Sequence, residues 1–339
     1  MELSTHYASD NYKVNVEHGA LKKLDTSSYD KVIAIIDDQV LALHRERLEC
    51  ITSLSTVYQV TAGEKLKTLT EYSKTINEII ENGVTRKSVI VAIGGGSVGD
   101  FAGFIAATIL RGIDFIQVPT TILAHDSAIG GKVGINAESG KNLIGAFKRP
   151  KAVVYDLDFL TTLPDAEKLS GFGEIIKHAL LDSPETVQLL QQDFADKSKL
   201  ADLDSIDYWL IKGMAQKLKV VEADEHEAGL RKVLNLGHTF GHAVEFTHHI
   251  PHGQAVMHGL LLTALLSDMD IRPLKDWFRR LGLTPVRYLP FENYYQLMLK
   301  DKKNQDGTIQ FVLMDQRIQA ISKERLLHAF NQLGAYDAY

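Results

Sequence analysis

The 339-residue sequence contains a single cysteine, Cys50, and no apolar run long enough to form a membrane-spanning helix. One thiol excludes a disulfide framework and any thiolate-rich zinc or iron–sulfur site. The longest apolar stretches, near residues 101–110 and 260–266, are far shorter than the roughly 18 residues that a spanning helix needs. Residues 1–19 are polar throughout, which predicts that no secretory signal is present.

The sequence also lacks an excess of basic residues. It has 37 lysine and arginine residues against 43 aspartate and glutamate residues, which gives a formal net charge of −6. Proteins that bind nucleic acid usually carry a basic face, so this balance argues against that class. With 45% hydrophobic and 24% charged residues, the composition is that of an ordinary globular protein. We therefore expect a cytoplasmic enzyme that binds neither nucleic acid nor a membrane.

The order of apolar patterns predicts two domains. In the first half, short β-branched runs alternate with helical spacing, which indicates a parallel sheet covered by helices. The predicted strands are 31–37, 56–60, 88–93, 114–118 and 152–155, and the helices between them are 66–81 and 101–110. Helical patterns then dominate at 169–181, 186–194, 206–223, 240–247, 255–267 and 275–281, with one hairpin near 309–321. We expect a Rossmann-like α/β dinucleotide-binding domain at 1–160 and a mostly α-helical metal- and substrate-binding domain at 161–339.

A glycine-rich turn directly follows one predicted strand. The segment GGGSVGD occupies residues 94–100, where Gly94, Gly96 and Gly99 fit the G-x-G-x-x-G pattern. Glycines at such a turn let backbone N–H groups approach a pyrophosphate at the start of a helix. The acidic residue expected about 20 residues later is missing, but Asp37 ends an earlier predicted strand and can bind the ribose instead. The alternative is a tight strand-to-helix turn without a ligand, and the context favours the dinucleotide site.

A second segment with glycines, residues 134–142, resembles a P-loop only superficially. Its spacing is one residue too long, and Asn142 stands where a P-loop has serine or threonine. The sequence therefore does not predict a nucleoside triphosphatase.

Histidines are concentrated in one segment, because six of the 13 fall between His238 and His258. His238 and His242 are four residues apart and share one face of a predicted helix. Earlier in the chain, Glu174, Lys177 and His178 share a helix face by the same spacing. Two histidines and a carboxylate form a site with an open position for zinc, cobalt or iron. Spacing alone nominates His238 and His242, with Glu174 as one of several possible carboxylates, and the alternative is a set of helix-capping and core histidines.

Eight cations stand next to these motifs, in amphipathic segments or beside glycine or asparagine. They are Arg111, Lys132, Lys141, Lys177, Lys217, Arg231, Lys302 and Lys303. In an acidic protein, cations gathered at one place predict a phosphorylated or carboxylated substrate. Each of them alone is typical of a solvated surface charge, so the prediction depends on the fold.

Taken together, the motifs resemble those of the 3-dehydroquinate synthase family. The segments are GEKLK, GGGSVGDFAGF, RGIDFIQVPTTILAHDSAIGGKVGIN, GKNLIGAF, GFGEIIKHALL, GLRKVLNLGHTFGHAVE, PHGQAV and DKKN, and they occur in order over nearly the whole chain. The resemblance implies conversion of 3-deoxy-D-arabino-heptulosonate 7-phosphate to 3-dehydroquinate and phosphate, the second step of the shikimate pathway. It also implies a tightly bound NAD and a zinc or cobalt ion.

The resemblance assigns residues motif by motif. Glu174, His238 and His252 would bind the metal, and His242 would then contact the substrate phosphate and take part in the proton relay. NAD would contact Asp37, Glu64, Lys67, Gly95, Gly96, Ser97, Asp100, Thr120, Thr121, Leu123, Lys141, Thr162, Leu163 and Glu167. The substrate would contact Asp126, Lys132, Lys141, Asn142, Lys177, Lys217, Arg231, Asn235, His242 and either Lys302 or Lys303. Catalytic roles would fall to Lys177, His242, Lys132, Asn142 and Arg111, and Arg111 would reach a neighbouring subunit's phosphate, which implies a homodimer.

The implied reaction is a carbon–oxygen lyase reaction that uses a redox cofactor. Oxidation of an alcohol by NAD acidifies the neighbouring proton, phosphate leaves, hydride returns, and an intramolecular aldol closure follows. The rivals are another sugar phosphate cyclase, a metal-dependent polyol dehydrogenase, and a degenerate binding protein. Lys217 and Arg231 argue against a cyclase whose substrate lacks a carboxylate. A dehydrogenase needs no such extensive anion site, and intact Glu174, His238, His252 and Lys177 argue against degeneration.

Overall fold

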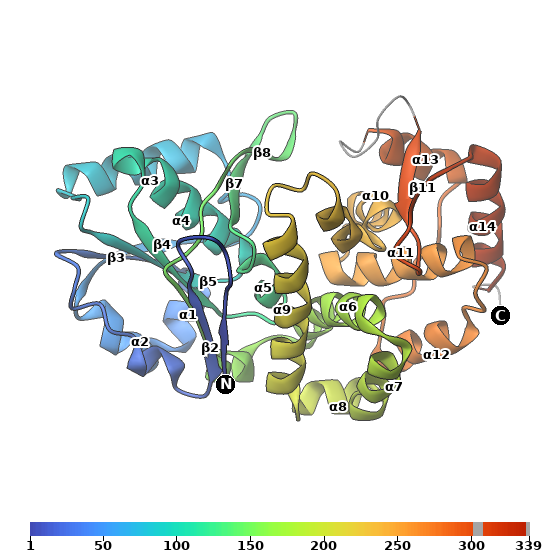
Figure 1. Ribbon diagram of the computed structural model, residues 1–339, viewed down its shortest axis with the longest axis horizontal. Coiled ribbons are helices and arrows are strands. Elements are labelled where there is room, and N and C mark those ends of the chain that lie inside the picture. Colours follow the sequence, from blue (N-terminus) through green and yellow to red (C-terminus); the bar gives the residue numbers. More distant parts are fainter. Residues whose placement is uncertain (301–307, 337–339) are drawn as a thin grey trace. The chain divides into compact units, whose positions relative to one another are not determined.

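The structure is a computed structural model that describes residues 1–300 and 308–336 (Figure 1). These residues form two compact units. The first comprises Met1–Leu163 and Leu210–Glu222, and the second comprises Pro164–Trp209 and the described residues from Ala223 onward. The helix α9, Ile206–Ala223, therefore contributes most of its length to the first unit.

The first unit is built on a seven-stranded sheet with the order β1-β2-β9-β6-β5-β3-β4. All neighbouring strands are parallel except β1 and β2. The strands are β1 Glu2–Ser4, β2 Lys13–Glu17, β3 Val32–Asp37, β4 Ser55–Val60, β5 Val89–Gly94, β6 Asp114–Pro119 and β9 Ala152–Asp156. The predicted Rossmann-like parallel sheet is confirmed.

Side chains of the central strands alternate between two apolar layers, as the period of a strand requires. Ile33 and Ile35 of β3 pack on one face with α3, Leu69–Glu81, and α4, Gly96–Thr108. Ala34 and Ile36 pack on the other face with α2, Arg45–Thr52, and the short helix η1, Ala20–Lys23. Both faces of β3 and β5 are buried, which is why these strands are continuous apolar runs. Besides most of α9, the other helices of this unit are α1 Asp38–Leu43, η2 Ile109–Arg111, α5 Ala124–Ser127 and η3 Leu157–Thr162.

The segment that resembles a P-loop forms a separate hairpin. Its strands are β7, Lys132–Ala137, and β8, Gly140–Phe147, which pair in antiparallel fashion. A Cβ on Gly134 would lie 2.7 Å from the carbonyl oxygen of Ile144, so this glycine lets the two backbones approach. The glycines therefore serve strand pairing, and the sequence patterns did not predict these strands.

The second unit is mostly helical, as expected. Its elements are α6 Asp165–Asp182, α7 Pro184–Asp193, α8 Lys197–Asp202, η4 Leu230–Asn235, α10 His238–His248, α11 His252–Leu266, α12 Arg272–Leu281, α13 Phe291–Leu299, β10 Ile309–Val312, β11 Ile318–Ile321 and α14 Lys323–Tyr336. The predicted late hairpin is β10–β11. The helix α11 is buried along nearly its whole length because α6, α10 and α14 surround it, and its sequence is therefore largely apolar. Across the described ranges, no helix is long and apolar enough to cross a membrane.

Candidate functional site

The glycine turn lies where the strand order of the sheet reverses. From β3 the chain adds β4 on one side and β5 on the other, so the carboxyl ends of β3 and β5 mark a topological switch point. Asp37 ends β3, and Gly94 ends β5 next to it, because Ile36 and Ile93 are paired in register. Open α/β sheets bind ligands at such a point. The structure thus places the acidic residue proposed for the ribose beside the turn proposed for the pyrophosphate.

The helix that follows this turn is open at its start. Its N-cap is Gly95, and no side chain of the described residues caps α4, so the first N–H groups can receive an anion. Thr120 N donates to Gly94 O at 3.1 Å, which brings the residues after β6 to the same edge. Of the other NAD contacts expected from the resemblance, Ser97 is in the first turn of α4, Thr121 and Leu123 precede α5, and Glu167 is in the first turn of α6.

A buried lysine lies beside α4. Lys67 is 3% exposed, and its Nζ donates to Asp100 Oδ2 at 2.7 Å and to Asn142 Oδ1. Burial raises the pKa of the Asp100 carboxyl, and the positive charge of Lys67 opposes this rise. Lys67 therefore links two residues from separate motifs: Asp100, which like Lys67 is expected at NAD, and Asn142, which is expected at the substrate.

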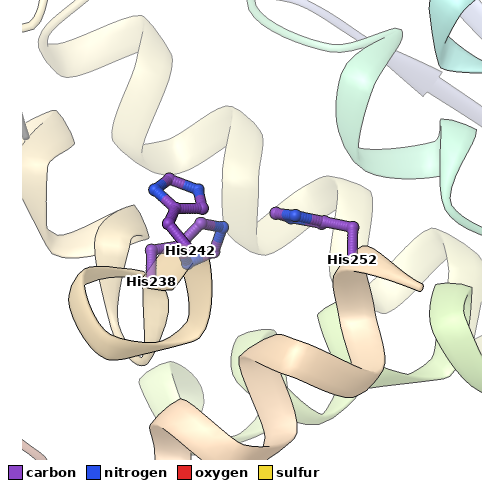
Figure 2. A group of neighbouring side chains, drawn as sticks. All are labelled: His238, His242 and His252. Atoms are coloured by element: carbon purple, nitrogen blue, oxygen red, sulfur yellow. The ribbon is translucent and has the colours of Figure 1, made fainter. Parts of the chain in front are cut away.

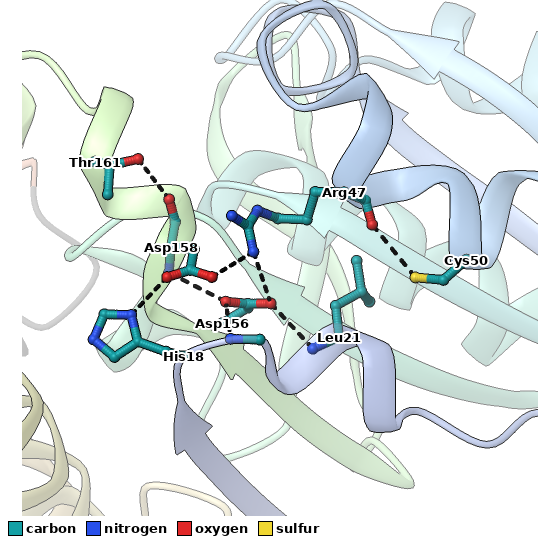
Figure 3. A network of polar contacts seen from close by, with 8 residues as sticks. His18, Leu21, Arg47, Cys50, Asp156, Asp158 and Thr161 are labelled. Carbon is teal, nitrogen blue, oxygen red and sulfur yellow. Dashed lines mark hydrogen bonds and ion pairs between the residues drawn. The ribbon is translucent and has the colours of Figure 1, made fainter.

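A polar network fixes the segment after β9 (Figure 3). The buried Asp156 carboxylate accepts N–H groups of Gly19 at 3.0 Å, Leu21 at 3.2 Å and Asp158 at 3.1 Å. Arg47 on α2 forms ion pairs with Asp156 and Asp158. Because buried charge is costly unless it is paired, this network holds η1, α2 and η3 in one arrangement.

The end of η3 carries Thr162, one of the expected NAD contacts. Its hydroxyl lies 2.7 Å from Nε2 of His44, whose ring packs edge-on against Phe159. On the neighbouring helix α2, the exposed Cys50 thiol donates to Arg47 O at 3.4 Å. The position of Thr162 is thus set by His44, the N-cap residue of α2, as well as by its own turn.

The second unit brings the histidines and the carboxylate together. His238 and His242 are on α10, and His252 begins α11 opposite them (Figure 2). One ligand atom of each lies within 4.8 Å of the others. Glu174 Oε1 on α6 lies 3.4 Å from His238 Nε2 and 3.3 Å from His252 Nε2. The spacing-based pair and the triad expected from the resemblance therefore occupy the same place, and the ligand set stays a prediction.

Hydrogen bonds orient two of these imidazoles. His238 Nδ1 lies 3.1 Å from Leu236 O, and a carbonyl only accepts, so Nδ1 carries the proton and Nε2 keeps its lone pair. His252 Nδ1 lies 2.8 Å from Glu245 Oε2, the carboxylate–histidine arrangement that commonly supports metal-binding histidines. The sequence patterns did not single out Glu245, and its place seven residues before His252 gave no signal. Two imidazole nitrogens and one carboxylate oxygen that converge in this way fit a divalent cation.

The charges around Glu174 influence one another strongly. Burial would raise the pKa of Glu174, but Lys177 and His238 outweigh burial and hold that pKa well below its usual range. Burial lowers the pKa of His238 to about 3. Burial would also lower the pKa of His252, but hydrogen bonds to Glu174 and Glu245 raise it to about 9. A cation that binds His252 Nε2 must therefore displace a proton there.

Glycines permit the close approach of the three helices. A Cβ on Gly253 of α11 would lie 1.7 Å from Ser170 O of α6, and a Cβ on Gly173 would lie 2.3 Å from Gly253 O. A Cβ on Gly259 would lie 1.8 Å from Gly237 O, next to the start of α10. Because Gly173 and Gly253 directly neighbour Glu174 and His252, the same contacts set the separation of the candidate ligands.

The expected substrate residues lie in several places. Lys177 is 1% exposed and pairs with Glu174, and Lys217 pairs with Asp126 at 2.9 Å. Arg231 is 3% exposed and donates to Glu225 O, Asn235 ends η4, and the exposed Arg111 ends η2 with φ of 68°. In the β7–β8 ladder, Lys132 is paired with Phe147 at one end, and Lys141 and Asn142 follow Gly140 at the other end. Lys302 and Lys303 lie outside the described residues.

Two family models match consecutive parts of the chain. Residues 57–170 match the 3-dehydroquinate synthase N-terminal model, and residues 171–304 match the C-terminal model. A protein named 3-dehydroquinate synthase from Macrococcus caseolyticus (strain JCSC5402) is 50% identical over 98% of this chain and 98% of its own length. One with the same name from Staphylococcus aureus (strain JH9) is 47% identical over 99% of each chain.

Solved structures of related folds are similar over nearly the whole chain. A 2-deoxy-scyllo-inosose synthase complexed with carbaglucose-6-phosphate, NAD+ and Co2+ has a TM-score of 0.87 at 22% identity, over 98% of this chain and all of its own (100%). A 2-epi-5-epi-valiolone synthase from Streptomyces hygroscopicus subsp. jinggangensis 5008, with NAD+ and Zn2+ bound, has a TM-score of 0.86 at 22% identity, over 96% and 97% of the two chains. An iron-containing alcohol dehydrogenase from Thermotoga maritima has a TM-score of 0.70 at 12% identity, over 98% and 99%. At these identities the likeness establishes the fold.

Proposed function

The chain belongs to the 3-dehydroquinate synthase family, and from this membership we propose which of its residues carry out the reaction. The protein is an NAD- and metal-dependent carbon–oxygen lyase of the shikimate pathway, which leads to the aromatic amino acids. It converts 3-deoxy-D-arabino-heptulosonate 7-phosphate to 3-dehydroquinate and phosphate. When bound, NAD supplies a reversible hydride acceptor, and zinc or cobalt supplies Lewis-acid polarisation of a substrate oxygen.

The convergence of Glu174, His238 and His252 is the observation that carries the proposal. Glu174, His238 and His252 would hold the cation, because one oxygen of Glu174 lies within 3.4 Å of Nε2 of both histidines. Leu236 and Glu245 hold the two rings in the orientation that presents these nitrogens. Three protein ligands leave a coordination position for the substrate.

The roles of the remaining substrate residues follow from their charge or their hydrogen-bonding groups. Arg231 and Lys217 are nearly buried cations, and we assign them to the substrate carboxylate, which sister cyclases with uncarboxylated substrates do not need to bind. Lys132, Asn142, Arg111 and His242 are assigned to the phosphate, where they would stabilise the charge of the leaving group. The proton that leaves the neighbouring carbon passes to His242 or to the phosphate itself. The buried Lys177 would stabilise negative charge on a substrate oxygen.

The dinucleotide site is assigned to the switch point of the sheet. Asp37 would bind a ribose, and the open N-terminus of α4 would receive the pyrophosphate. Residues 1–160 would then be the NAD-binding domain and residues 161–339 the metal- and substrate-binding domain. A cytoplasmic homodimer, in which Arg111 serves the partner's site, is part of the proposal, and light scattering tests the dimer.

The decisive experiment measures phosphate release from the heptulosonate 7-phosphate with a catalytic amount of NAD, with and without a chelator. We expect many turnovers per NAD, loss of activity with the chelator, and recovery with zinc or cobalt. NADH that accumulates stoichiometrically with an alcohol substrate, without phosphate release, would instead indicate a polyol dehydrogenase. Turnover of an uncarboxylated sugar phosphate at the same efficiency would indicate a sister cyclase.

A further inference from the structure

Asn136 lies where three segments of the first unit meet, and none of the assignments above includes it. It belongs to β7 of the β7–β8 hairpin (Figure 1). Its backbone N–H donates to Lys67 O at 2.8 Å. Its side-chain Nδ2 donates to Glu64 Oε2 at 2.6 Å, and its Oδ1 accepts the backbone N–H of Asn142 at 2.8 Å. One residue thus connects the loop after β4 with strand β8.

We propose that Asn136 is a positioning residue that couples the dinucleotide site to the phosphate-binding hairpin. It holds Glu64, assigned to NAD, and Asn142, assigned to the substrate phosphate, in a fixed mutual arrangement. The inference rests on the proposed function for these two assignments. What it adds is a coupling: binding of NAD at Glu64 changes the affinity for phosphate at Asn142, and binding of phosphate changes the affinity for NAD, because Asn136 connects the two residues.

The backbone of the hairpin is shaped around this residue. The register of β7 and β8 shifts between Ile135 and Ala137, so Asn136 stands at a bulge. A bulge removes a residue from the ladder and redirects its side chain, and bulges are frequent beside active sites. Here the freed N–H of Asn136 bonds to Lys67 O across to the neighbouring loop. The bulge therefore turns a ladder residue into a connection between two segments.

Asn142 depends on this connection for its conformation. It has φ of 55°, the left-handed region that costs energy for most residues and that asparagine tolerates better. Its N–H is held by Asn136 Oδ1, and its side-chain oxygen accepts from Lys67 Nζ. Lys67 also pairs with Asp100 of α4. Asn142 is thus held at its backbone by Asn136 and at its side chain by Lys67, which in turn pairs with the last residue of the glycine-rich segment.

Asparagine is the residue type that these contacts require. Its amide donates through Nδ2 and accepts through Oδ1, whereas an ionised aspartate of the same size only accepts. Glu64 and Asn142 are both exposed. Without this amide the Glu64 side chain would sample several rotamers, and the backbone of Asn142 would lose the hydrogen bond that holds its left-handed conformation. Both would then have to be ordered on binding. A ligand that orders Glu64 would then no longer help to order Asn142.

The test measures coupling between two ligands. Calorimetry gives the dissociation constant of NAD with and without saturating inorganic phosphate, in the zinc-loaded full-length protein. For the wild type we expect phosphate to change NAD affinity by roughly fivefold or more, and by reciprocity NAD to change phosphate affinity by the same factor. Asn136→Ala should reduce this factor to about one. Asn77→Ala is the matched control, because the exposed Asn77 amide donates to Ser73 O within its own helix, α3.

Two further variants separate positioning from a structural role. Asn136→Asp keeps an acceptor for the backbone N–H of Asn142, but it places a second carboxylate against that of Glu64. We therefore expect about tenfold weaker NAD binding at an unchanged melting temperature. In the double variant Asn136→Asp with Glu64→Gln, the amide at position 64 can donate to the carboxylate at position 136. This reversed hydrogen bond should recover part of the lost NAD affinity. The inference is overturned if the wild type and Asn136→Ala show equal coupling. It is also overturned if the wild type shows no coupling although it releases phosphate from its substrate. A wild type that releases no phosphate contradicts the proposed function instead.

Discussion

Replacement of Gly253 by alanine should damage cation binding far more than it damages the fold. A Cβ at this position would lie 1.7 Å from Ser170 O and 2.6 Å from Ser170 C. Both are backbone atoms of α6, so no side chain can turn away. Contacts under 3.0 Å are essentially never seen for real Cβ atoms, so α6 and α11 must move apart by about 1.3 Å.

That movement is large compared with what a metal site tolerates. Ligand distances in such sites are fixed to within about 0.2 Å, and Glu174 on α6 now lies 3.3 Å from His252 on α11. Overpacking of this kind typically costs about 1–3 kcal/mol of unfolding free energy. For a unit of this size that loss lowers the melting temperature by roughly 2–4 °C per kcal/mol. We therefore expect a folded protein whose zinc affinity falls by at least about tenfold, the lower end for disturbed ligand support.

The assay is a competitive zinc titration together with thermal unfolding monitored by circular dichroism. Gly173→Ala should give a smaller loss, because its Cβ would lie 2.3 Å from Gly253 O and requires a movement of only about 0.7 Å. Gly334→Ala is the control, since a Cβ at this position in α14 meets nothing within 4 Å. It should leave zinc affinity unchanged and stabilise the helix by up to about 1 kcal/mol. Wild-type zinc affinity in Gly253→Ala would refute the reasoning.

Three further predictions concern residues of the second unit. His252→Ala should lose metal and activity together while circular dichroism stays native, and a variant with full metal content and activity would exclude His252 as a ligand. Arg231→Ala should raise KM for the carboxylated substrate more than it raises the dissociation constant of NAD, and equal losses would mean that the carboxylate is bound elsewhere. The Asp224 carboxylate accepts N–H groups of Ala228, Gly229 and Arg231, and these bonds lower its pKa. These hydrogen bonds therefore stabilise residues 224–231 at a pH above the ordinary aspartate pKa, and the stabilisation is lost as the pH falls through the lowered pKa of Asp224. The amide shifts of Gly229 and Arg231 should titrate together below that ordinary pKa, and a midpoint at or above it would contradict the assignment.

Periodicity predicted the fold class well because the patterns of β3 and β5 are strong and local. Both strands are uninterrupted apolar runs whose two faces are buried. The β7–β8 hairpin was missed because Gly134, Gly140 and Gly145 interrupt the apolar pattern. Two of these glycines are needed where the strands cross closely, since Cβ atoms on Gly134 and Gly145 would lie 2.7 Å and 2.8 Å from opposing carbonyl oxygens.

The candidate metal site shows the limit of spacing arguments. Helical spacing relates His238 to His242, but Glu174 comes from another helix and His252 starts the next one. Their convergence depends on close helix packing, which a single sequence encodes only as scattered glycines. Family motifs indicated Glu174 and His252. The support from Glu245 and the contacts of Asn136 depend on the tertiary structure, which brings these residues next to their partners.

The single cysteine gives the protein a built-in position for a spectroscopic reporter. Cys50 is exposed on α2, and its thiol contacts the backbone of Arg47, which holds Asp156 and Asp158. A maleimide dye would attach at this residue alone, without any engineered substitution, because no other thiol exists in the chain. Partial burial raises the pKa of the thiol, so labelling should proceed faster at mildly alkaline pH. The fluorescence of such a dye, measured with and without NAD, would report on the surroundings of the segment that carries Thr162, one of the NAD contacts proposed above.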